Sequence, residues 1–368
     1  MKKRFLTLLC IIAANSIVIG CNNTQTPIKT MADERDSSLY HNGSSENYYS
    51  ENCPKQLDSW LQAAQQGQAS AQTSSGYCYY FGTGIVKDEA QAVAWFRKAA
   101  EQGDTGAQSF LGMMYLAGQG VAKDETQAVA WFRKAAEQGD ADAQSGLGVM
   151  YLAGIGVVKD EAQAVAWLRK AAEQGDAKAQ SNLGTMYGEG TGVAKDEAQA
   201  VAWFRKAAEQ GYAEAQYNLG IMYENGTGVA KDETQAVAWY RKAAEQGYVN
   251  AQFNLGLMYA NGKGVTKDET QAVAWLRKAA EQGDAGAQFN LGRMYAAGTG
   301  VAKDEAQAVT WFRKAAEQGD AEAQFNLGLM YISGTGVTKD NAQGVEWLRK
   351  AAEQDYTPAQ QALNQLSQ

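Results

Sequence analysis

Histidine and proline are scarce in this chain of 368 residues, and basic residues are outnumbered by acidic ones. It has one histidine, His41, and three prolines. A single histidine argues against histidine-based metal sites and Ser-His-Asp hydrolysis, and three prolines exclude proline-rich linkers and collagen-like structure. The formal net charge of −8 does not provide the basic face that nucleic acids require. We therefore expect no metal, no cofactor and no nucleic-acid partner.

The first twenty residues have the features of an export signal. A basic start is followed by an apolar run that contains no charge and is too short for a transmembrane helix. The run ends in Val18-Ile19-Gly20-Cys21, which resembles the lipobox of bacterial lipoproteins. The resemblance implies cleavage after residue 20 and lipidation of Cys21, and two or more acyl chains anchor a protein stably. An ordinary secretory signal with an incidental cysteine is the alternative.

The resemblance also predicts where the protein resides. It implies an exported protein in the bacterial cell envelope that contacts the membrane through its lipid anchor only. Asn22 follows the cysteine, which favours the outer membrane of a Gram-negative cell, facing the periplasm or the surface. Residues 21–52 are polar and aperiodic, so we expect a lipidated flexible tether there. Residues 53–368 would then form the folded part.

Tryptophan sets the period of the folded part. It recurs every 36 residues from Trp95 to Trp347, and a Lys-Asp pair recurs with it. Trp60 lies 35 residues before Trp95, which predicts a first copy that is one residue short. A fixed period of this length indicates a solenoid, in which helix pairs stack because one pair cannot bury its apolar face alone.

Each copy predicts two helices. Asp88 is an N-cap with Gln91 three residues later, the pattern of a capping box, and a glycine ends the helix at residue 103. In the other helix Ala107, Leu111 and Met114 fall on one face. Gly112 provides a flat spot for a closely packed neighbour. The fold class is therefore all-α.

The repeated motif is specific. Ala-x-Ala-Gln-x-x-Leu-Gly-x-Met-Tyr-x-x-Gly-x-Gly-Val-x-Lys-Asp, followed by Ala-x-x-Trp-x-x-Lys-Ala-Ala-x-x-Gly, is matched throughout residues 213–247. It resembles the Sel1-like repeat family, relatives of tetratricopeptide arrays. The resemblance implies a right-handed α/α superhelix of about eight repeats and a role as a scaffold or adaptor that binds a protein or peptide. We expect capping helices at both ends, one opening at Cys53-Pro54 and one over residues 357–368.

Two cysteines remain in the folded part. Cys53 opens one helix and Cys78 lies late in the next, antiparallel helix, so the two ends should meet. An even pair in an exported domain predicts a disulfide. The alternative is a buried thiol at Cys78, which occupies a position that is methionine in the other copies.

The sequence predicts no enzyme. Some cysteine-rich relatives of the family are linked to β-lactam binding or hydrolysis, a remote alternative for this chain. No Ser-x-x-Lys or Lys-Thr-Gly motif occurs. The recurrent Asp and Glu residues are caps and solvated helix faces.

Variation between copies is concentrated on one face of the second predicted helix, away from Leu111. Such a face is where a binding solenoid carries its specificity. The serine at residue 109 becomes aromatic in the C-terminal half, which predicts a groove for a protein or peptide partner, lined by Tyr217, Ile221, Phe253, Leu257, Phe289, Arg293, Phe325 and Leu329. Packing between neighbouring repeats is the other interpretation of these rings. An envelope component that binds peptidoglycan or polysaccharide is the alternative function.

Overall fold

In the computed structural model residues 43–367 are described, and helices are the only regular elements among them. The helices with even labels are α2 Gly43–Gln65, α4 Glu89–Glu101, α6 Glu125–Glu137, α8 Glu161–Glu173, α10 Glu197–Glu209, α12 Glu233–Glu245, α14 Glu269–Glu281, α16 Glu305–Glu317 and α18 Asn341–Glu353. Those with odd labels are α3 Ala69–Phe81, α5 Thr105–Ala117, α7 Ala141–Ala153, α9 Ala177–Glu189, α11 Ala213–Asn225, α13 Val249–Asn261, α15 Ala285–Ala297, α17 Ala321–Ser333 and α19 Thr357–Leu366. The prediction of an all-α solenoid is confirmed.

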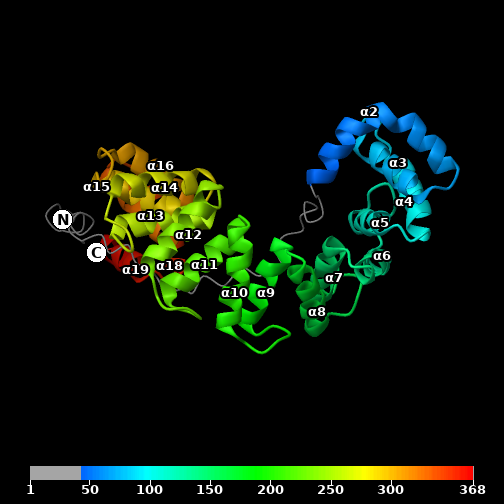
Figure 1. The fold of residues 1–368 in the computed structure, drawn as a ribbon. Coiled ribbons are helices and arrows are strands. Elements are labelled where there is room, and N and C mark those ends of the chain that lie inside the picture. Colours follow the sequence, from blue (N-terminus) through cyan, green and yellow to red (C-terminus); the bar gives the residue numbers. More distant parts are fainter. Residues whose placement is uncertain (1–42, 368) are drawn as a thin grey trace. The chain divides into compact units, whose positions relative to one another are not determined.

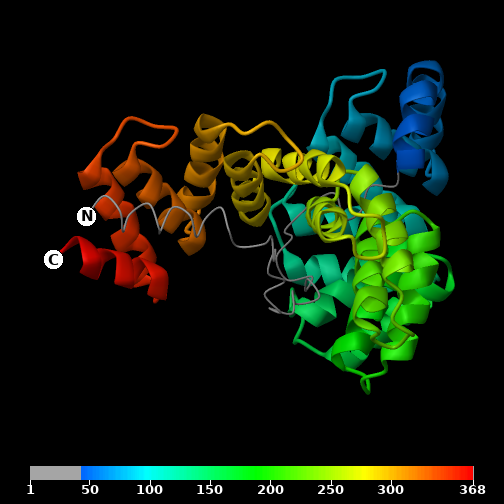
Figure 2. The same ribbon diagram turned by 90° about the vertical axis from the view of Figure 1, so that its left-hand side faces the viewer.

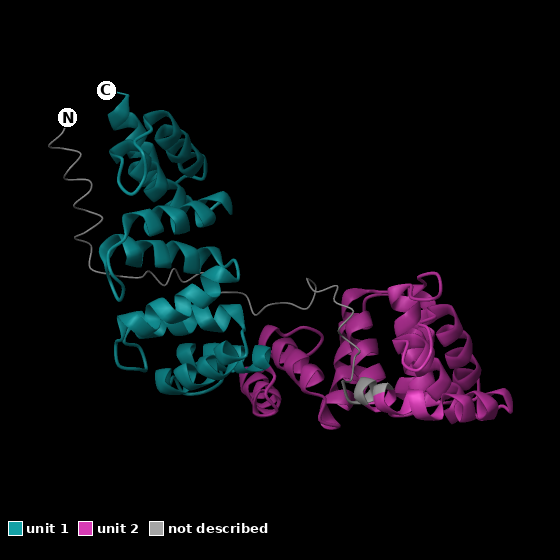
Figure 3. Cartoon of the chain, turned by 90° about the horizontal axis from the view of Figure 1, so that it is seen from above, with its two compact units in different colours: residues 1–26, 213–368 teal, residues 27–212 magenta. Residues whose placement is uncertain are grey.

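Two compact units divide the chain (Figure 3). Among the described residues, the N-terminal unit holds α2–α10 and the C-terminal unit holds α11–α19. Within each unit a helix packs mainly against the helices directly before and after it, so successive helices are stacked (Figures 1 and 2). The predicted signal peptide over residues 1–20 and the predicted lipid site Cys21 lie outside the described residues.

The even helices from α4 onward start at the predicted aspartate caps. The Asp88 carboxylate accepts a hydrogen bond from the backbone N–H of Gln91 at 3.0 Å. In place of the return bond of a capping box, the Asp88 N–H donates to the carbonyl of Tyr79 at 2.9 Å. The equivalent bond recurs every 36 residues and joins the start of each of these even helices to the odd helix before it.

The odd helices pack their apolar face against the even helices. Leu111 and Met114 of α5 are fully buried. The predicted flat spot is confirmed, because a Cβ on Gly112 would lie only 3.1 Å from the Phe132 ring. Gly118 follows α5 with φ at 71°, a left-handed conformation that glycine adopts without strain.

A ladder of glutamines connects each helix pair to the next. Gln108 of α5 donates to the carbonyl of Ala100 at 3.0 Å and accepts from Gln138 at 2.7 Å. The same two bonds recur at Gln144 and at Gln288, in both units. Gln108 is only 4% exposed, and hydrogen bonds in such a low dielectric are stronger than in water. The ladder therefore fixes the relative position of successive pairs.

The first helix begins earlier than predicted. α2 starts at Gly43, so residues 43–52 are helical and the tether predicted for residues 21–52 is wrong over this stretch. The polar composition hides an apolar stripe at helical spacing, formed by Tyr49, Cys53, Leu57 and Trp60. Tyr49 stacks on Tyr77 of α3 at 4.2 Å between ring centroids, which stabilises the added turns.

Pro54 lies inside α2 and not in its first turn, where it was expected. Proline has no N–H to donate to the carbonyl four residues earlier, and α2 is bent along its length (Figure 1).

The 36-residue register extends into α2. The carbonyl of Ala64 accepts from the side chain of Gln72 at 3.1 Å, an arrangement that recurs 36 residues later. Trp60 therefore takes the position of Phe96 and not that of Trp95. The prediction of a first copy that is one residue short is wrong, because the tryptophan moved by one position while the length of the copy stayed the same.

Candidate binding face

The variable residues lie where neighbouring odd helices meet. We call this the odd-helix layer and define it by the positions of residues 109, 110 and 113 and their equivalents at multiples of 36. Phe110 of α5 lies 4.6 Å from Tyr77 of α3 between ring centroids. Ser109 donates to Oδ1 of Asp140, the cap residue of α7, at 3.1 Å. Position 110 therefore faces the preceding odd helix, and position 109 faces the following one.

In the C-terminal unit the rings at position 109 pack within the stack. Tyr217 lies 5.8 Å from Tyr240 and 5.2 Å from Tyr248 between ring centroids. Phe289 lies 5.8 Å from Phe312 of α16. Phe325 lies 5.5 Å from Tyr356, at the start of α19. Each ring therefore contacts an even helix or the next odd helix.

These contacts correct part of the predicted groove. Tyr217, Phe289 and Leu329 are 4%, 8% and 6% exposed, so they cannot line an open surface. The remaining residues of the predicted groove are half-buried, namely Ile221, Phe253, Leu257, Arg293 and Phe325. A partner can reach these five, and their role in binding stays a prediction. The periodic pattern could not separate the two sets, because it does not show which neighbour covers a face.

In the N-terminal unit the same position is polar. Ser109 and Ser145 donate to the aspartates that cap the next odd helix, at 3.1 and 3.3 Å. Ser145 is 7% exposed. A buried hydroxyl that is hydrogen-bonded avoids the desolvation cost of an unpaired one. The two units therefore fill one structural position with different chemistry.

One charged group stands in the odd-helix layer of the C-terminal unit. The Arg293 guanidinium carbon lies 5.7 Å from the centroid of the Phe289 ring. Arg293 occupies a position that is Leu257 one repeat earlier and Leu329 one repeat later. Burial raises the pKa of Glu322, the Asp320 charge adds to this effect, and the Arg293 charge opposes it. A cation beside two carboxylates and a ring can bind polar and aromatic groups of a partner.

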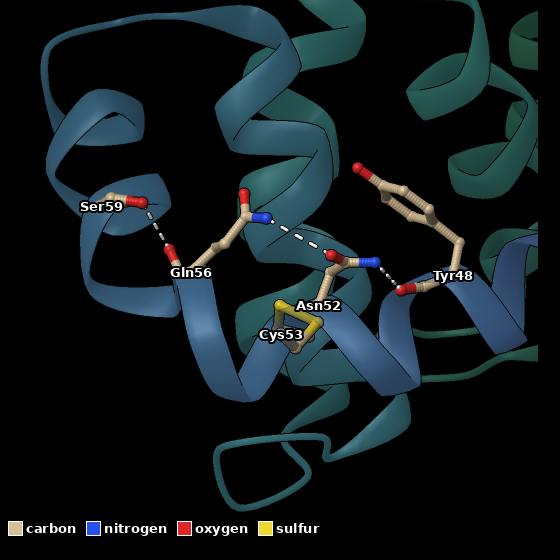
Figure 4. The surroundings of a disulfide bond; sticks show 6 residues. Tyr48, Asn52, Cys53, Gln56 and Ser59 are labelled. Carbon is tan, nitrogen blue, oxygen red and sulfur yellow. Dashed lines mark hydrogen bonds between the residues drawn. A yellow bond between two sulfur atoms is a disulfide. The ribbon is translucent and has the colours of Figure 1, made fainter.

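A disulfide joins α2 to α3 (Figure 4). Cys53 and Cys78 are fully buried, and their Cα atoms lie 5.7 Å apart. Of the two interpretations of Cys78, the structure has the disulfide and not the free thiol. The neighbouring Asn52 amide donates to the Tyr48 carbonyl at 2.7 Å. The disulfide bond connects the bent helix α2 to α3 and so to the stack of repeats.

A pocket of about 240 Å³ lies between α7 and α9 in the N-terminal unit. Its buried lining residues are Asn182, Thr185 and Met186. Half-buried Val149 and Leu152 line it from α7, and the remaining lining residues are Ala153, Lys159, Glu161, Glu189 and Thr191. The Nδ2 atom of Asn182 is buried and has no hydrogen-bond partner. An unpaired buried amide is costly and marks a place where a ligand can supply the missing bond.

Metal and membrane sites were sought in residues 43–367. No group of three His, Cys, Asp or Glu side chains in this part of the chain could hold a metal ion. No helix described for the chain has the length and apolar character needed to span a membrane.

Comparison with known families assigns the repeats. Eight consecutive segments match the Sel1 repeat, at residues 69–104, 105–140, 141–176, 177–212, 213–248, 249–284, 285–320 and 321–356. The chain belongs to the Sel1 repeat family. Each repeat begins with an odd helix and includes the even helix that follows. Sel1 repeats form scaffolds that generally mediate protein–protein interactions.

Solved structures share this fold. The crystal structure of c5321, a protective antigen present in uropathogenic Escherichia coli strains and displaying an SLR fold, is 44% identical, with a TM-score of 0.81 over 84% of this chain and 67% of that chain. A Sel1 repeat protein from Oxalobacter formigenes is 37% identical, with a TM-score of 0.65 over 84% of this chain and 90% of that chain. No curated protein matches the sequence.

The pocket was not among the sites predicted from the sequence. Its signal is the lack of a ring at all three of the positions that meet there, namely Ser145, Leu168 and Asn182. The leucine and asparagine alone do not predict unfilled space, since Leu276 and Asn290 repeat that pair beside Phe253. Finding it requires knowing that positions 96 and 110 touch, as Phe96 and Phe110 do at 5.3 Å between ring centroids.

Proposed function

We propose that this Sel1 repeat chain is a non-catalytic scaffold that binds a protein partner through the odd-helix layer of its C-terminal unit. The observation that carries the proposal is the contrast between positions. The caps, glutamine ladder and buried apolar face repeat almost unchanged, whereas the odd-helix layer differs from repeat to repeat. A solenoid with an invariant framework and a variable face uses that face for recognition.

Arg293 is the centre of the proposed contact. Arginine and aromatic residues are over-represented among the residues that dominate binding energy. Arg293 is half-buried and lies over the Phe289 ring. Its side chain is therefore already partly ordered, which reduces the conformational entropy lost on binding. The carboxylates of Asp320, which caps α17, and of Glu322 in the first turn of α17 suit donors on a partner.

A protein partner is favoured over peptidoglycan or polysaccharide. Sugar rings would need open aromatic faces to stack on, whereas the rings of Tyr217 and Phe289 are buried between repeats and those of Phe253 and Phe325 are half-buried. Among the described residues, Tyr48 is the exposed aromatic side chain, and it lies in α2 of the N-terminal unit.

We further propose that Cys21 carries a lipid and holds the chain in the bacterial cell envelope. The proposal is supported by the basic start, the short apolar run and the run Val18-Ile19-Gly20-Cys21. The E. coli relative is described as a protective antigen, which fits a protein presented at the cell surface.

Cross-linking of an envelope fraction, followed by capture of the chain and mass spectrometry, tests the scaffold proposal. We expect Arg293→Leu to fold normally, since leucine occupies this position in both adjacent repeats, and to lose a partner that the unchanged chain captures. The expected loss of binding free energy is about 2 kcal/mol or more. Thr310→Ala on the exposed face of α16 is the matched control, because six other repeats carry alanine there. Equal capture by both variants would contradict the proposed face.

Metabolic labelling with a palmitate analogue tests the anchor. Cys21→Ala should remove the label and release the chain from membranes, because no other lipid site is proposed. Unchanged labelling of the variant would contradict the anchor and leave the binding face unaffected.

A further inference from the structure

One junction between repeats lacks a ring. Three positions meet at each junction. The positions equivalent to residues 109 and 96 belong to the earlier repeat, and the position equivalent to residue 110 belongs to the later one. Phe96 contacts Phe110 in this way, and Tyr217 contacts Tyr240. At every other junction within either unit at least one of these positions is aromatic. The junction between repeats 141–176 and 177–212 carries Ser145, Leu168 and Asn182. The pocket between α7 and α9 lies at this junction.

The lining of the pocket is apolar on α7 and mixed on α9. Val149 and Leu152 line it from α7, and Met186 lines it from α9. The amide of Asn182, also on α9 and 6% exposed, has an unpartnered donor. Next to it on α9, the Thr185 hydroxyl donates to the Ser181 carbonyl at 3.3 Å and keeps its oxygen as an acceptor. A complementary ligand group has an apolar body and a tip that both accepts and donates one hydrogen bond.

The charged residues that line the pocket argue against an anionic ligand. Lys159 at the rim is already paired with Glu161 at 2.9 Å. Burial raises the pKa of Glu189, and no described cation offsets its charge in an ion pair. An anionic ligand would meet two carboxylates and no free cation. A purely apolar ligand would leave the buried Asn182 amide without a hydrogen-bond partner, which weakens its binding.

The C-terminal unit shows how the same junction is filled. Tyr240 stands at the position of Leu168, two repeats later, and its phenol donates to Oε2 of Glu224 at 2.7 Å. The side chain of Asn254, which stands at the position of Asn182, is hydrogen-bonded to the same phenol. An asparagine at position 110 is therefore satisfied by a phenol when one is present.

We infer that the pocket between α7 and α9 binds a phenol ring, supplied by a tyrosine side chain of a protein partner. The ring lies against Val149, Leu152 and Met186. The phenol oxygen accepts from Nδ2 of Asn182 and donates to the Thr185 hydroxyl oxygen. The volume of about 240 Å³ is smaller than that of pockets for drug-sized ligands, which fits a single side chain. The source of the phenol rests on the proposed function, whereas binding of a free phenol does not.

The test uses p-cresol, which is the tyrosine side chain without its backbone, and the purified full chain. Binding is followed by the methyl NMR signal of Met186, with Met294 of the C-terminal unit as a reference signal. We expect p-cresol to shift the Met186 signal saturably and toluene, which lacks the hydroxyl, to bind about three- to tenfold more weakly, the range for one hydrogen bond. Equal binding of the two ligands, or no shift of Met186 at high p-cresol concentration, would overturn the inference.

Three variants separate recognition from general effects on folding. Asn182→Leu keeps a similar volume and should lower p-cresol affinity by about three- to tenfold. Asn290→Leu is the matched control, because its Nδ2 already donates to the Gly286 carbonyl at 2.8 Å, and it should leave p-cresol binding unchanged. Leu168→Tyr should supply a phenol to Asn182, as Tyr240 does to Asn254, and so abolish p-cresol binding while raising the melting temperature.

The outcomes distinguish this inference from the scaffold proposal. Unchanged p-cresol affinity in Asn182→Leu, or p-cresol binding that survives in a folded Leu168→Tyr variant, would overturn the phenol site and leave the captured partner unaffected. Saturable p-cresol binding in a chain that captures no partner would support the pocket and contradict the scaffold.

Discussion

The two units of this Sel1 repeat chain differ in one layer of a common framework. The glutamine ladder has the same bonds in both, for example from Gln138 at 2.7 Å and from Gln318 at 2.8 Å. In the odd-helix layer the N-terminal unit uses a serine bonded to an aspartate 31 residues later. The C-terminal unit uses rings, and Tyr217 lies on Tyr248 at the same spacing. The junction can therefore change from polar to aromatic when both of its partners change together.

Two junctions of the C-terminal unit are mixed. Phe253 and Phe289 have replaced the serines, but Asp284 and Asp320 still cap the next helices. Burial raises the pKa of both carboxyl groups, and the backbone N–H groups that they accept from oppose this rise. Where only one partner has changed, the aspartate is desolvated and has no serine hydroxyl to bond. The comparison thus separates matched junctions from mismatched ones.

The outer ends of the units also differ. The N-terminal unit is closed by a covalent bond between α2 and α3. The C-terminal unit is closed by α19, which buries Ala359 and Ala362 and contacts Phe325 through Tyr356. Only the first end therefore depends on the redox state of its surroundings.

The largest expected effect comes from removing the covalent end. Cys53→Ala with Cys78→Met removes the disulfide without placing a charge at the fully buried position of Cys53, and methionine is the residue found 36 positions after Cys78. The loop-entropy estimate for a separation of 25 residues is a loss of about 3–4 kcal/mol. Hydrogen exchange should show reduced protection in α2 and α3. Protection in the C-terminal unit should stay unchanged, because solenoid contacts are between neighbours. Equal loss along the whole chain would contradict the nearest-neighbour stack.

The next effect tests whether the two junction types can be exchanged. Phe289→Ser removes a buried ring, which costs about 3–5 kcal/mol. The introduced hydroxyl can donate to Asp320, as Ser109 does to Asp140, which offsets about 1 kcal/mol. We therefore expect a net loss of about 2–4 kcal/mol, localised by hydrogen exchange to α15–α17.

Phe289→Ala is the matched variant, because it makes the same cavity without a hydroxyl. The alanine variant should be the less stable of the two. Equal stability would show that the serine–aspartate bond does not form in the aromatic unit. No loss in either variant would restore Phe289 as a residue of an open groove.

The sequence predicted the framework because the framework repeats. The caps at Asp88 and its equivalents, the flat spot at Gly112 and the closing helix over residues 357–366 follow from local rules that each copy obeys independently. The start of α2 at residue 43 was not predicted, because these turns are stabilised by the contact of Tyr49 with Tyr77 on another helix. The polar composition of the stretch gives no indication of that contact.

The candidate sites were harder to predict. Whether Phe289 or Arg293 is exposed depends on which neighbouring helix covers position 109 and which covers position 113. Helical periodicity gives the direction of a side chain but not the distance to the next repeat. The pocket at Asn182 lies at a junction where Ser145, Leu168 and Asn182, which are distant in sequence, all lack a ring.

The smallest expected effect sharpens the comparison between matched and mismatched junctions. Burial raises the pKa of Asp284 above its usual value of 3.8, so desolvation outweighs the N–H groups of the α15 terminus that Asp284 accepts from. The folded state then binds the proton more tightly than the unfolded state. The stability contributed by the protonated form is complete below the unfolded pKa and is lost as pH rises through the folded pKa.

Asp284→Asn keeps the cap, since asparagine is an equally good N-cap residue. It should therefore raise the melting temperature at pH 7, by a free energy of no more than about 1 kcal/mol. The gain should shrink on acidification and vanish below the unfolded pKa of 3.8. Asp140→Asn is the control in a matched junction, where the carboxylate accepts from Ser109, and it should bring no gain. A gain that persists unchanged at pH 3, or an equal gain at both sites, would show that burial beside Phe253 is not what distinguishes the mixed junction.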